Sequence, residues 1–275
     1  MNIRPALLML LFPVLFACER QTDNGWLGYG EGDYAFVSAP QPGWVTDMKV
    51  ERGQVVKQGD LLFVLDSTEQ EASRDQAQAT LAQAQASLRQ EESNLVYART
   101  ELARQDNLAR YNAGTPAQRD LARTNAQQSA AHVAQLKAQI GQMEAGLKGA
   151  AYGLSQRQIL AQTQGPVQDI YFRPGEYLPA STPVVSILPP ANIYVRFFVP
   201  ESQMPGVKLG QKVRIACDGC KPMTATITFI ASQVEFTPPV IFSVGNREKL
   251  VFKLEARAPG GLSVHPGQPV TVRPL

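Results

Sequence analysis

The feature that most constrains the fold is a segment that occurs twice in the chain. It runs from Gly43 to Leu65 and again from Gly165 to Ile187, and a single offset of 122 residues aligns the two copies without a gap. Glycines fall at matching positions and apolar residues alternate between them, as in a small β unit that is used twice. One such unit cannot cover its own apolar face. The two copies are therefore expected to pack into one sandwich, and the chain between them must leave this sandwich and return to it.

The segment between the copies is predicted to form two long helices. Between Pro42 and Pro166 the chain has a single proline, Pro116. Proline interrupts helix interiors, so one central proline favours two helices that meet there. The segment is rich in Ala, Gln, Glu and Arg, which suit a helix. Ala113-Gly114-Thr115-Pro116 offers a glycine beyond the first helix, then a Thr N-cap with Pro at the first helical position.

Both predicted helices carry the apolar spacing of a coiled-coil seam. Leucines recur at intervals of seven in the first arm, and apolar residues step by three and four in the second. An arm of about 45 residues is about 65 Å long at 1.5 Å per residue. An intermolecular coiled coil and a simple helical spacer are alternatives, but a split sandwich favours a hairpin within one chain. Folding about Gly114 places Leu81 opposite Leu147, Leu88 opposite Ile140 and Leu95 opposite Val133.

The N-terminal residues indicate export and a lipid anchor. The apolar run Ala6–Ala17 is shorter than the ~20 residues that span a bilayer, so residues 1–18 are interpreted as a signal peptide. Its end, Leu15-Phe16-Ala17-Cys18, resembles a lipoprotein processing box, in which Cys18 takes the lipid. The polar residues that follow suit a tether. Ordinary cleavage beside an incidental cysteine is the alternative. We expect a periplasmic protein held by lipid, with the inner membrane favoured.

Charge and side-chain patterns argue against several function classes. A net charge of +2 without a run of Lys or Arg gives no nucleic-acid footprint. We identify no nucleophile, base and orienting group in a plausible arrangement, so we expect no enzyme. Cys217 and Cys220 flank Asp-Gly, a tight-turn signal between predicted strands, and a structural disulfide is favoured in an oxidising compartment. Metal and redox roles for this C-x-x-C remain open, but His132 and His265 lie in distant segments, and we expect no metal.

The repeated β unit resembles the biotinyl/lipoyl fold, a flattened sandwich of two similar halves. In carrier members of that fold, a lysine lies on the turn that joins the halves. Here the helical insert replaces that turn, so we expect neither biotin nor lipoate nor another cofactor. Residues 191–275 contain several short alternating runs that are predicted to form a small β-barrel. Tyr29–Val37 alternates as well and is expected to add an early strand to this barrel.

The order of these parts resembles the HlyD-type periplasmic adaptor, or membrane fusion protein, family. The resemblance implies an elongated α+β fold, with a long antiparallel coiled-coil hairpin inserted in a split lipoyl-like sandwich and a β-barrel after it. The expected segments are a signal peptide (1–18), a tether with the first barrel strand (19–36), the first half-sandwich (37–66), the hairpin (67–158, tip near 113–116), the second half-sandwich (159–190) and the barrel (191–275).

The resemblance also implies partners. The family's tip motif of Arg, Leu and Ser is matched here by Arg104, Leu108 and Thr115, with Thr in place of Ser. These residues would dock on a TolC-like outer-membrane channel. Alternatively, Leu108 completes the hairpin's own seam, Thr115 is an N-cap and Arg104 is solvated. An inner-membrane transporter is the other implied partner. The ABC type is favoured over a proton-driven pump, because the chain stops at Leu275 without the further domain that adaptors of such pumps carry.

Family adaptors are thought to stand side by side as a ring, so self-association is expected too. An envelope scaffold or chaperone that grips clients with the hairpin is an alternative function, and a biotin or lipoate carrier subunit is another.

Overall fold

A computed structural model describes residues 25–236 and 250–275. The predicted signal peptide, Cys18 and most of the tether lie outside the described residues. Two compact units make up the rest, one of residues 33–192 and one that combines residues 25–32 with Ile193–Leu275. In the described part of the chain, no helix combines the length and apolarity needed to cross a bilayer.

The β part of the first unit is a sandwich of two four-stranded antiparallel sheets. Both copies of the repeat contribute strands to each sheet, which is how two half-units come to share one core. Buried side chains from both copies fill the space between the sheets, among them Val45, Phe63, Val167, Leu178 and Ile187. One sheet has the order β2 (Ala35–Ser38), β9 (Pro183–Ile187), β7 (Gly165–Ile170) and β4 (Val55–Val56), and the other has β6 (Gln158–Leu160), β5 (Leu61–Leu65), β3 (Gly43–Met48) and β8 (Tyr177–Leu178).

The two copies repeat each other down to single hydrogen bonds. The amide of Val45 donates to the carbonyl of Glu176 at 2.9 Å, and the amide of Val167, 122 residues on, donates to the carbonyl of Gln54 at 2.8 Å. The repeat also extends further than the sequence indicated. Strands β2 and β6 are equivalent, since Val37 pairs with Val185 and Ile159 pairs with Phe63, a difference of 122 at both positions.

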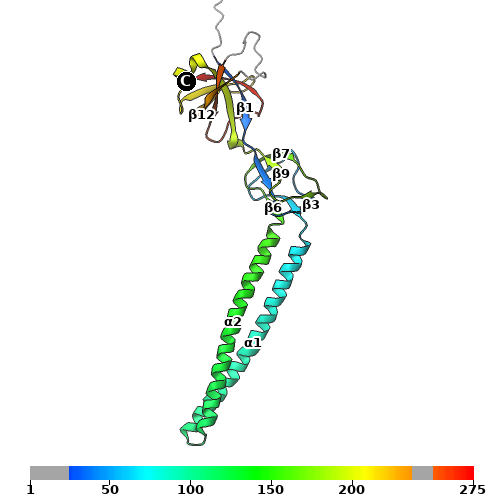
Figure 1. The fold of residues 1–275 in the computed structure, drawn as a ribbon, viewed down its shortest axis with the longest axis vertical. Helices are drawn as coiled ribbons and strands as arrows, with labels where there is room; N and C mark the ends of the chain where they lie inside the picture. Colours follow the sequence, from blue (N-terminus) through cyan, green and yellow to red (C-terminus); the bar gives the residue numbers. More distant parts are fainter. Residues whose placement is uncertain (1–24, 237–249) are drawn as a thin grey trace, which may run out of the picture. The chain divides into compact units, whose positions relative to one another are not determined.

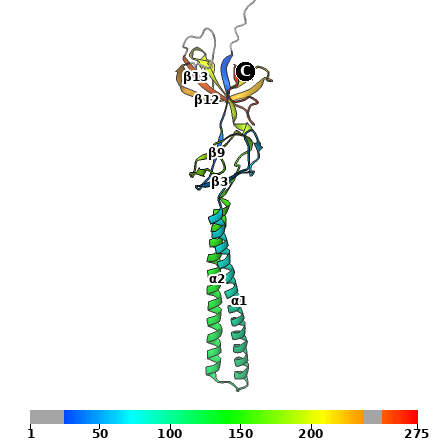
Figure 2. The same ribbon diagram turned by 90° about the vertical axis from the view of Figure 1, so that its right-hand side faces the viewer.

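The insert is a helical hairpin formed by α1 (Thr68–Arg110) and α2 (Pro116–Ser155), which lie side by side in both views (Figures 1 and 2). Leu95 and Val133, which were predicted to face each other, are both buried. Ala84, Ala122, Ala126 and Ile140 are the other buried residues of the two helices. Lys137 Nζ lies 3.1 Å from Glu92 Oε1, and this ion pair links the helices close to the predicted register.

The second unit is a closed six-stranded barrel with an apolar interior. Phe197, Val213, Ile215, Leu254 and Val272 are fully buried in it. Two 3-10 segments, η1 (Pro190–Asn192) and η2 (Glu201–Gly206), precede and follow one of its strands, with η1 assigned to the first unit. The strand order is β1 (Trp26–Gly32), β10 (Ile193–Pro200), β13 (Leu250–Arg257), β12 (Met223–Phe236), β11 (Lys212–Ala216) and β14 (Pro269–Pro274). The α+β class predicted from the sequence, with its inserted hairpin, split sandwich and following barrel, is confirmed.

One expected strand is divided between the two units. Tyr29–Val37 was predicted to be a single barrel strand, but β1 ends at Gly32 and β2 begins at Ala35. The first belongs to the barrel, whereas the second pairs with β9 of the sandwich. The alternation continues through Asp33 and Tyr34, so it carries no signal for the break. The change of partner strand determines where the break between β1 and β2 falls.

Candidate functional site at the hairpin tip

The turn that joins the two helices is closely defined by local hydrogen bonds. Helix α1 ends at Arg110, after which the amide of Ala113 donates to the carbonyl of Leu108 at 2.9 Å. Asn112 has a φ of 53°, a left-handed conformation that Asn tolerates better than most residues. Such a turn holds the side chains around it in fixed directions, which a docking surface requires.

Thr115 forms a capping box at the start of α2. Its Oγ1 accepts a hydrogen bond from the amide of Gln118 at 3.3 Å, and Gln118 Oε1 accepts one from the amide of Thr115 at 3.3 Å. Pro116 follows at the first helical position, where its missing N–H costs no hydrogen bond. The N-cap role considered from the sequence is thus present in the structure.

Arg104 and Leu108 lie on the last turns of α1 and are both accessible. Arg104 Nη1 is 2.8 Å from Glu101 Oε2, in an ion pair one turn back on the same helix, and its side chain is 64% exposed. Leu108 is 37% exposed, beside Gly114, where an added Cβ would lie 3.3 Å from Leu108 Cβ. Leu108 therefore stands outside the buried row of the seam, next to the turn.

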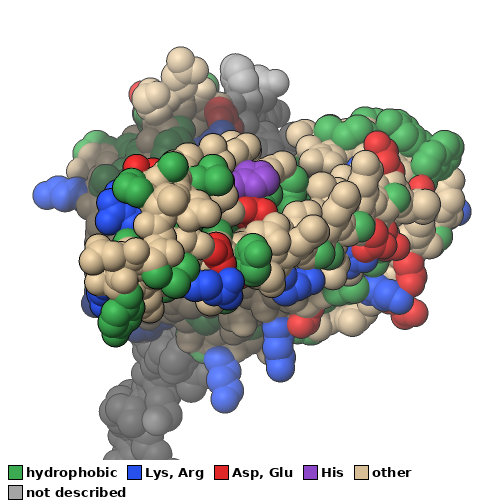
Figure 3. Space-filling view, turned by 90° about the horizontal axis from the view of Figure 1, so that it is seen from below, with side chains coloured by type: hydrophobic (Ala, Val, Ile, Leu, Met, Phe, Trp, Pro, Cys, Tyr) green, Lys and Arg blue, Asp and Glu red, His purple; other side chains and the backbone are tan. Residues whose placement is uncertain are grey.

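Two further exposed apolar side chains at this end of the hairpin were not predicted from the sequence. Tyr111 is 83% exposed in the turn itself, and Leu121 is 63% exposed on the second turn of α2. Leu121 precedes the buried Ala122, so it lies off the seam spacing, and that mismatch was an available signal. On the face of the molecule seen from below, apolar and charged side chains are interspersed (Figure 3). The accessible chemistry at the tip is mixed, with apolar groups, a cation and polar groups.

A small electrostatic cluster links the helices farther along the hairpin. The Glu91 carboxylate accepts a hydrogen bond from Asn94 at 3.0 Å, and His132 Nδ1 of α2 lies 3.6 Å away. The hydrogen bond from Asn94 is the largest cause that holds the pKa of Glu91 below its usual value, and Ser129 and His132 add to it. This cluster joins the two helices by polar contacts on the flank of the apolar seam.

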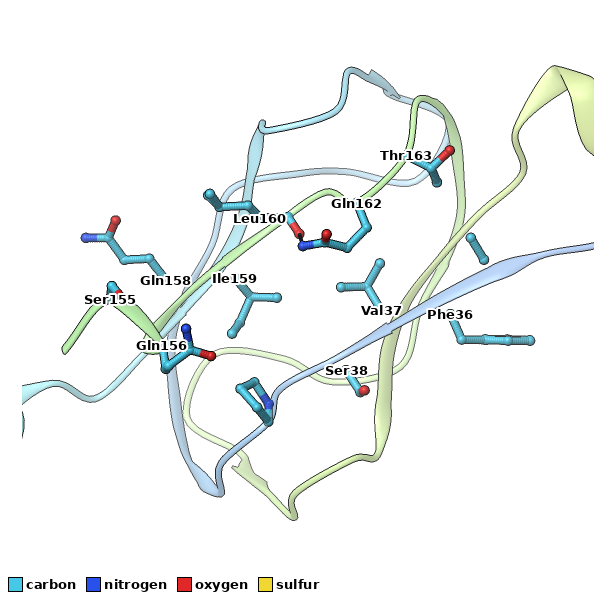
Figure 4. Close-up of a pocket in the computed structure, with 12 residues that line it drawn as sticks. Phe36, Val37, Ser38, Ser155, Gln156, Gln158, Ile159, Leu160, Gln162 and Thr163 are labelled. Atoms are coloured by element: carbon cyan, nitrogen blue, oxygen red, sulfur yellow. Dashed lines mark hydrogen bonds between the residues drawn. The ribbon is translucent and has the colours of Figure 1, made fainter. Parts of the chain in front are cut away.

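A shallow groove of about 500 Å³ lies between β2 and β6, the equivalent outer strands of the two sheets (Figure 4). The buried side chains of Val37 and Ile159 belong to its lining. Its other lining side chains are apolar or neutral amides and hydroxyls, and none is ionisable. The groove therefore offers surface and hydrogen bonds but no acid, base or metal ligand.

Cys217 and Cys220 are joined as a disulfide within a tight turn between β11 and β12, with their Cα atoms 5.4 Å apart. The amide of Cys220 donates to the carbonyl of Cys217 at 3.2 Å, and Gly219 takes a φ of 76°. Across the described residues, no group of three His, Cys, Asp or Glu side chains could hold a metal ion. Whether the cysteines are oxidised in the cell stays a prediction.

Sequence comparison finds relatives, several of which are described as membrane proteins. The chain is 30% identical over 143 residues to a UPF0194 membrane protein of Acidithiobacillus ferridurans, a match that covers 51% of this chain and 42% of the relative. It is 23% identical to the colistin resistance protein EmrA of Acinetobacter baumannii, over 90% of this chain and 83% of that protein. The chain spans about half the length of the first curated relatives it matches. No family model matches it.

Comparison with solved structures shows the same fold elsewhere. MacA of Actinobacillus actinomycetemcomitans superposes with a TM-score of 0.70 at 20% identity, over 91% of this chain and 77% of that one. The membrane fusion protein Spr0693 of Streptococcus pneumoniae superposes with a TM-score of 0.55 at 16% identity, over 90% and 97% of the two chains. At these identities the likeness establishes the fold.

Proposed function

Because the chain resembles the HlyD-type periplasmic adaptor, or membrane fusion protein, family in both sequence and fold, we propose that it is an adaptor subunit of an export system. In this proposal it bridges an inner-membrane transporter and a TolC-like outer-membrane channel. The observation that carries the proposal is the hairpin of α1 and α2, which leaves the sandwich after β5 and returns to it at β6. With 43 residues, α1 is about 65 Å long at 1.5 Å per residue, a reach that a compact core has no need for.

The tip is the proposed contact with the channel. Arg104, Leu108 and Thr115 offer a cation, an apolar side chain and a hydroxyl around one turn. Helix ends of a channel could pack against this turn as one coiled coil continues into another. Thr115 can serve as N-cap and contact at once, since its hydroxyl keeps a donor hydrogen while its oxygen accepts from Gln118. Tyr111 and Leu121 extend the apolar part of this surface.

The N-terminus is proposed to be held at the inner membrane by lipid on Cys18, with the protein in the periplasm. An ABC-type transporter is the proposed inner-membrane partner, and its nucleotide hydrolysis would supply the energy. The adaptor itself would perform no chemistry. Copies standing side by side as a ring would seal a path for the exported substrate.

Crosslinking in cells tests the tip contact. Cysteine or a photoreactive residue at Leu108 should capture an outer-membrane channel protein in cells that export normally. The matched control is the same group at Arg89, an exposed position on the same helix that lies about 28 Å from Leu108 at 1.5 Å per residue. Equal capture from both positions, or no capture of a channel from Leu108 while export continues, would contradict the docking.

A client-binding envelope scaffold is the second candidate, because α1 also exposes apolar side chains far from the tip. Val96 and Tyr97 are 64% and 73% exposed on its outer side. A scaffold would crosslink through these residues to varied envelope proteins, and deletion of its gene would leave export intact. Neighbouring genes for an ATPase and a multi-spanning permease favour the adaptor instead. Intact-mass measurement separates both from a biotin or lipoate carrier, which would show an adduct on a lysine.

A further inference from the structure

The internal repeat gives the sandwich two equivalent exits for the chain. After β5 the chain leaves at Asp66 and enters α1, and after β9 it leaves at Leu188. The amide of Asp66 donates to the carbonyl of Trp44 at 2.9 Å, and the amide of Leu188 donates to the carbonyl of Pro166 at 3.1 Å. Both donors and both acceptors are 122 residues apart. The same backbone hydrogen bond therefore holds both exits, and differences between their side chains reflect what each exit has to do.

The side chains differ in charge between the two halves, both where the chain leaves the sandwich and where it enters it. Where the hairpin returns to the sandwich, Arg157 is buried with 9% of its surface exposed. Its counterpart 122 residues earlier is Ala35, and the counterpart of the hairpin-exit Asp66 is the buried Leu188. Burying a cation is unfavourable unless polar partners compensate it, and Arg157 Nε is buried without a hydrogen-bond partner. Since Ala35 and Leu188 occupy the equivalent positions in the other half of the sandwich, the sandwich fold by itself does not require a cation at position 157.

The contacts of Arg157 account for the presence of a buried arginine at this position, because they join three segments at the root of the hairpin. Its Nη1 donates to the carbonyl of Pro42, just before β3, at 2.8 Å. Its main-chain carbonyl accepts from the amide of Leu65 at the end of β5, and its amide donates to the carbonyl of Leu154 in the last turn of α2. Gly43 leaves the space for the guanidinium, since an added Cβ there would lie 2.9 Å from Nη1.

The start of α1 is held at the same place. Asp66 Oδ1 accepts hydrogen bonds from the amide of Thr68 at 3.1 Å and from its hydroxyl at 2.7 Å. These bonds are the main cause that lowers the pKa of the Asp66 carboxyl, and the positive charge of Arg157 contributes to it. The start of α1 is thus held mainly by its own hydrogen bonds, and the charge of Arg157 is a smaller influence on the same carboxyl.

We propose that Arg157 is a positioning residue that fixes the hairpin to the sandwich in one orientation, so that the root is a rigid joint and not a hinge. Its importance rests on the proposed function, because the position of the tip matters for a bridge. With an arm of about 65 Å, a tilt of about 10° at the root moves the tip by about 11 Å. Such a displacement exceeds the diameter of a helix backbone and would separate the tip from a docked partner.

Electron-spin distance measurement tests the joint on the isolated full-length chain. Labels on Cys residues placed at Lys57 in the sandwich and Gln90 in α1, both exposed, report the angle of the hairpin. Cys18 is replaced by Ser, and the disulfide-bonded cysteines do not take the label. We expect Arg157→Ala to broaden the distance distribution and Arg157→Lys, which keeps the cation, to broaden it less. The control Arg89→Ala, on the exposed side of α1, should leave it unchanged.

Hydrogen exchange separates a loosened root from a destabilised sandwich. In Arg157→Ala, loss of a charged hydrogen bond at the root should accelerate hydrogen exchange at the backbone amides of Leu65 and of residue 157 by roughly tenfold to a hundredfold. The amides of the core strand β9 should keep their protection. If Arg157→Ala does not fold, Gly43→Ala serves instead, because it displaces the guanidinium and keeps Arg157 in place. A distance distribution as narrow as that of the parent in either folded variant overturns the proposal. Neither measurement involves a channel or export, so the proposed function can fail independently.

Discussion

Four glycines in α2 provide a sharp test of how this helix is stabilised. At Gly141, Gly146 and Gly149 an added Cβ would meet no atom within 4 Å, and the backbone is helical. Glycine in a helix interior is less favourable than alanine by about 0.8–1.0 kcal/mol, because its backbone loses more freedom on folding. Replacing these three by Ala should therefore raise the free energy of unfolding by about 2.5–3 kcal/mol if the sites act independently. Gly153 is left unchanged because it is partly buried near the root.

Urea denaturation followed by circular dichroism at the helix band measures this change. Two control variants each keep one feature of the triple variant. The first exchanges the same two residue types in the same helix, and the second adds a Cβ to a glycine that has free space around it. Ala145→Gly, at an exposed position of the same helix, should lower the unfolding free energy by about 1 kcal/mol. Gly53→Ala also meets no atom within 4 Å, but its φ of 85° penalises a side chain, so it should destabilise by about 1–2 kcal/mol. No gain in the triple variant, with both controls behaving as stated, would refute the reasoning. A gain in stability with a loss of export would instead point to a partner that needs the bare helix surface.

Three further predictions concern the disulfide, the hairpin cluster and the cap. Reducing the Cys217–Cys220 disulfide, or replacing both cysteines by Ser, should lower the free energy of unfolding by about 2 kcal/mol, because the unfolded chain then regains the entropy of a four-residue loop. An unchanged midpoint of urea denaturation would exclude this stabilising role. Folding lowers the pKa of Glu91, so the stability that this carboxylate contributes is present above its usual pKa and is lost as the pH falls through the lower pKa of the folded state. The melting temperature of the parent should therefore fall more steeply in that acidic range than the melting temperature of Glu91→Gln. Thr115→Ala should cost about 1 kcal/mol through loss of the N-cap, whereas Thr115→Ser should not, and equal effects would argue against capping.

Much of the fold was predictable because its signals are local or repeated. A single proline in a long Ala- and Gln-rich stretch, together with apolar residues at coiled-coil spacing, predicts a hairpin and its register. Leu95 and Val133 face the seam for that reason. Arg104, Leu108 and Thr115 were proposed as the candidate tip because they match the spacing of the motif in the family that the chain resembles. Tyr111 and Leu121 were missed for different reasons. Tyr111 lies in the turn, where no helical pattern marks it, whereas Leu121 departs from the seam spacing of α2, and this departure was overlooked.

What the sequence alone determined is the set of elements with a period of their own, namely the two helices, their turn and the duplicated β unit from Gly43 to Leu65. The tertiary structure decided what depends on partners distant in the chain. It divided the alternating run Tyr29–Val37 between two units, since a strand joins whichever edge it can pair with. It also made β2 and β6 equivalent and brought Arg157 to the carbonyl of Pro42, 115 residues earlier. Such contacts leave no local pattern, because hydrogen bonds and burial between remote segments depend on where the folded chain places them. The periodicity of a helix or strand, in contrast, is visible in the order of consecutive residues.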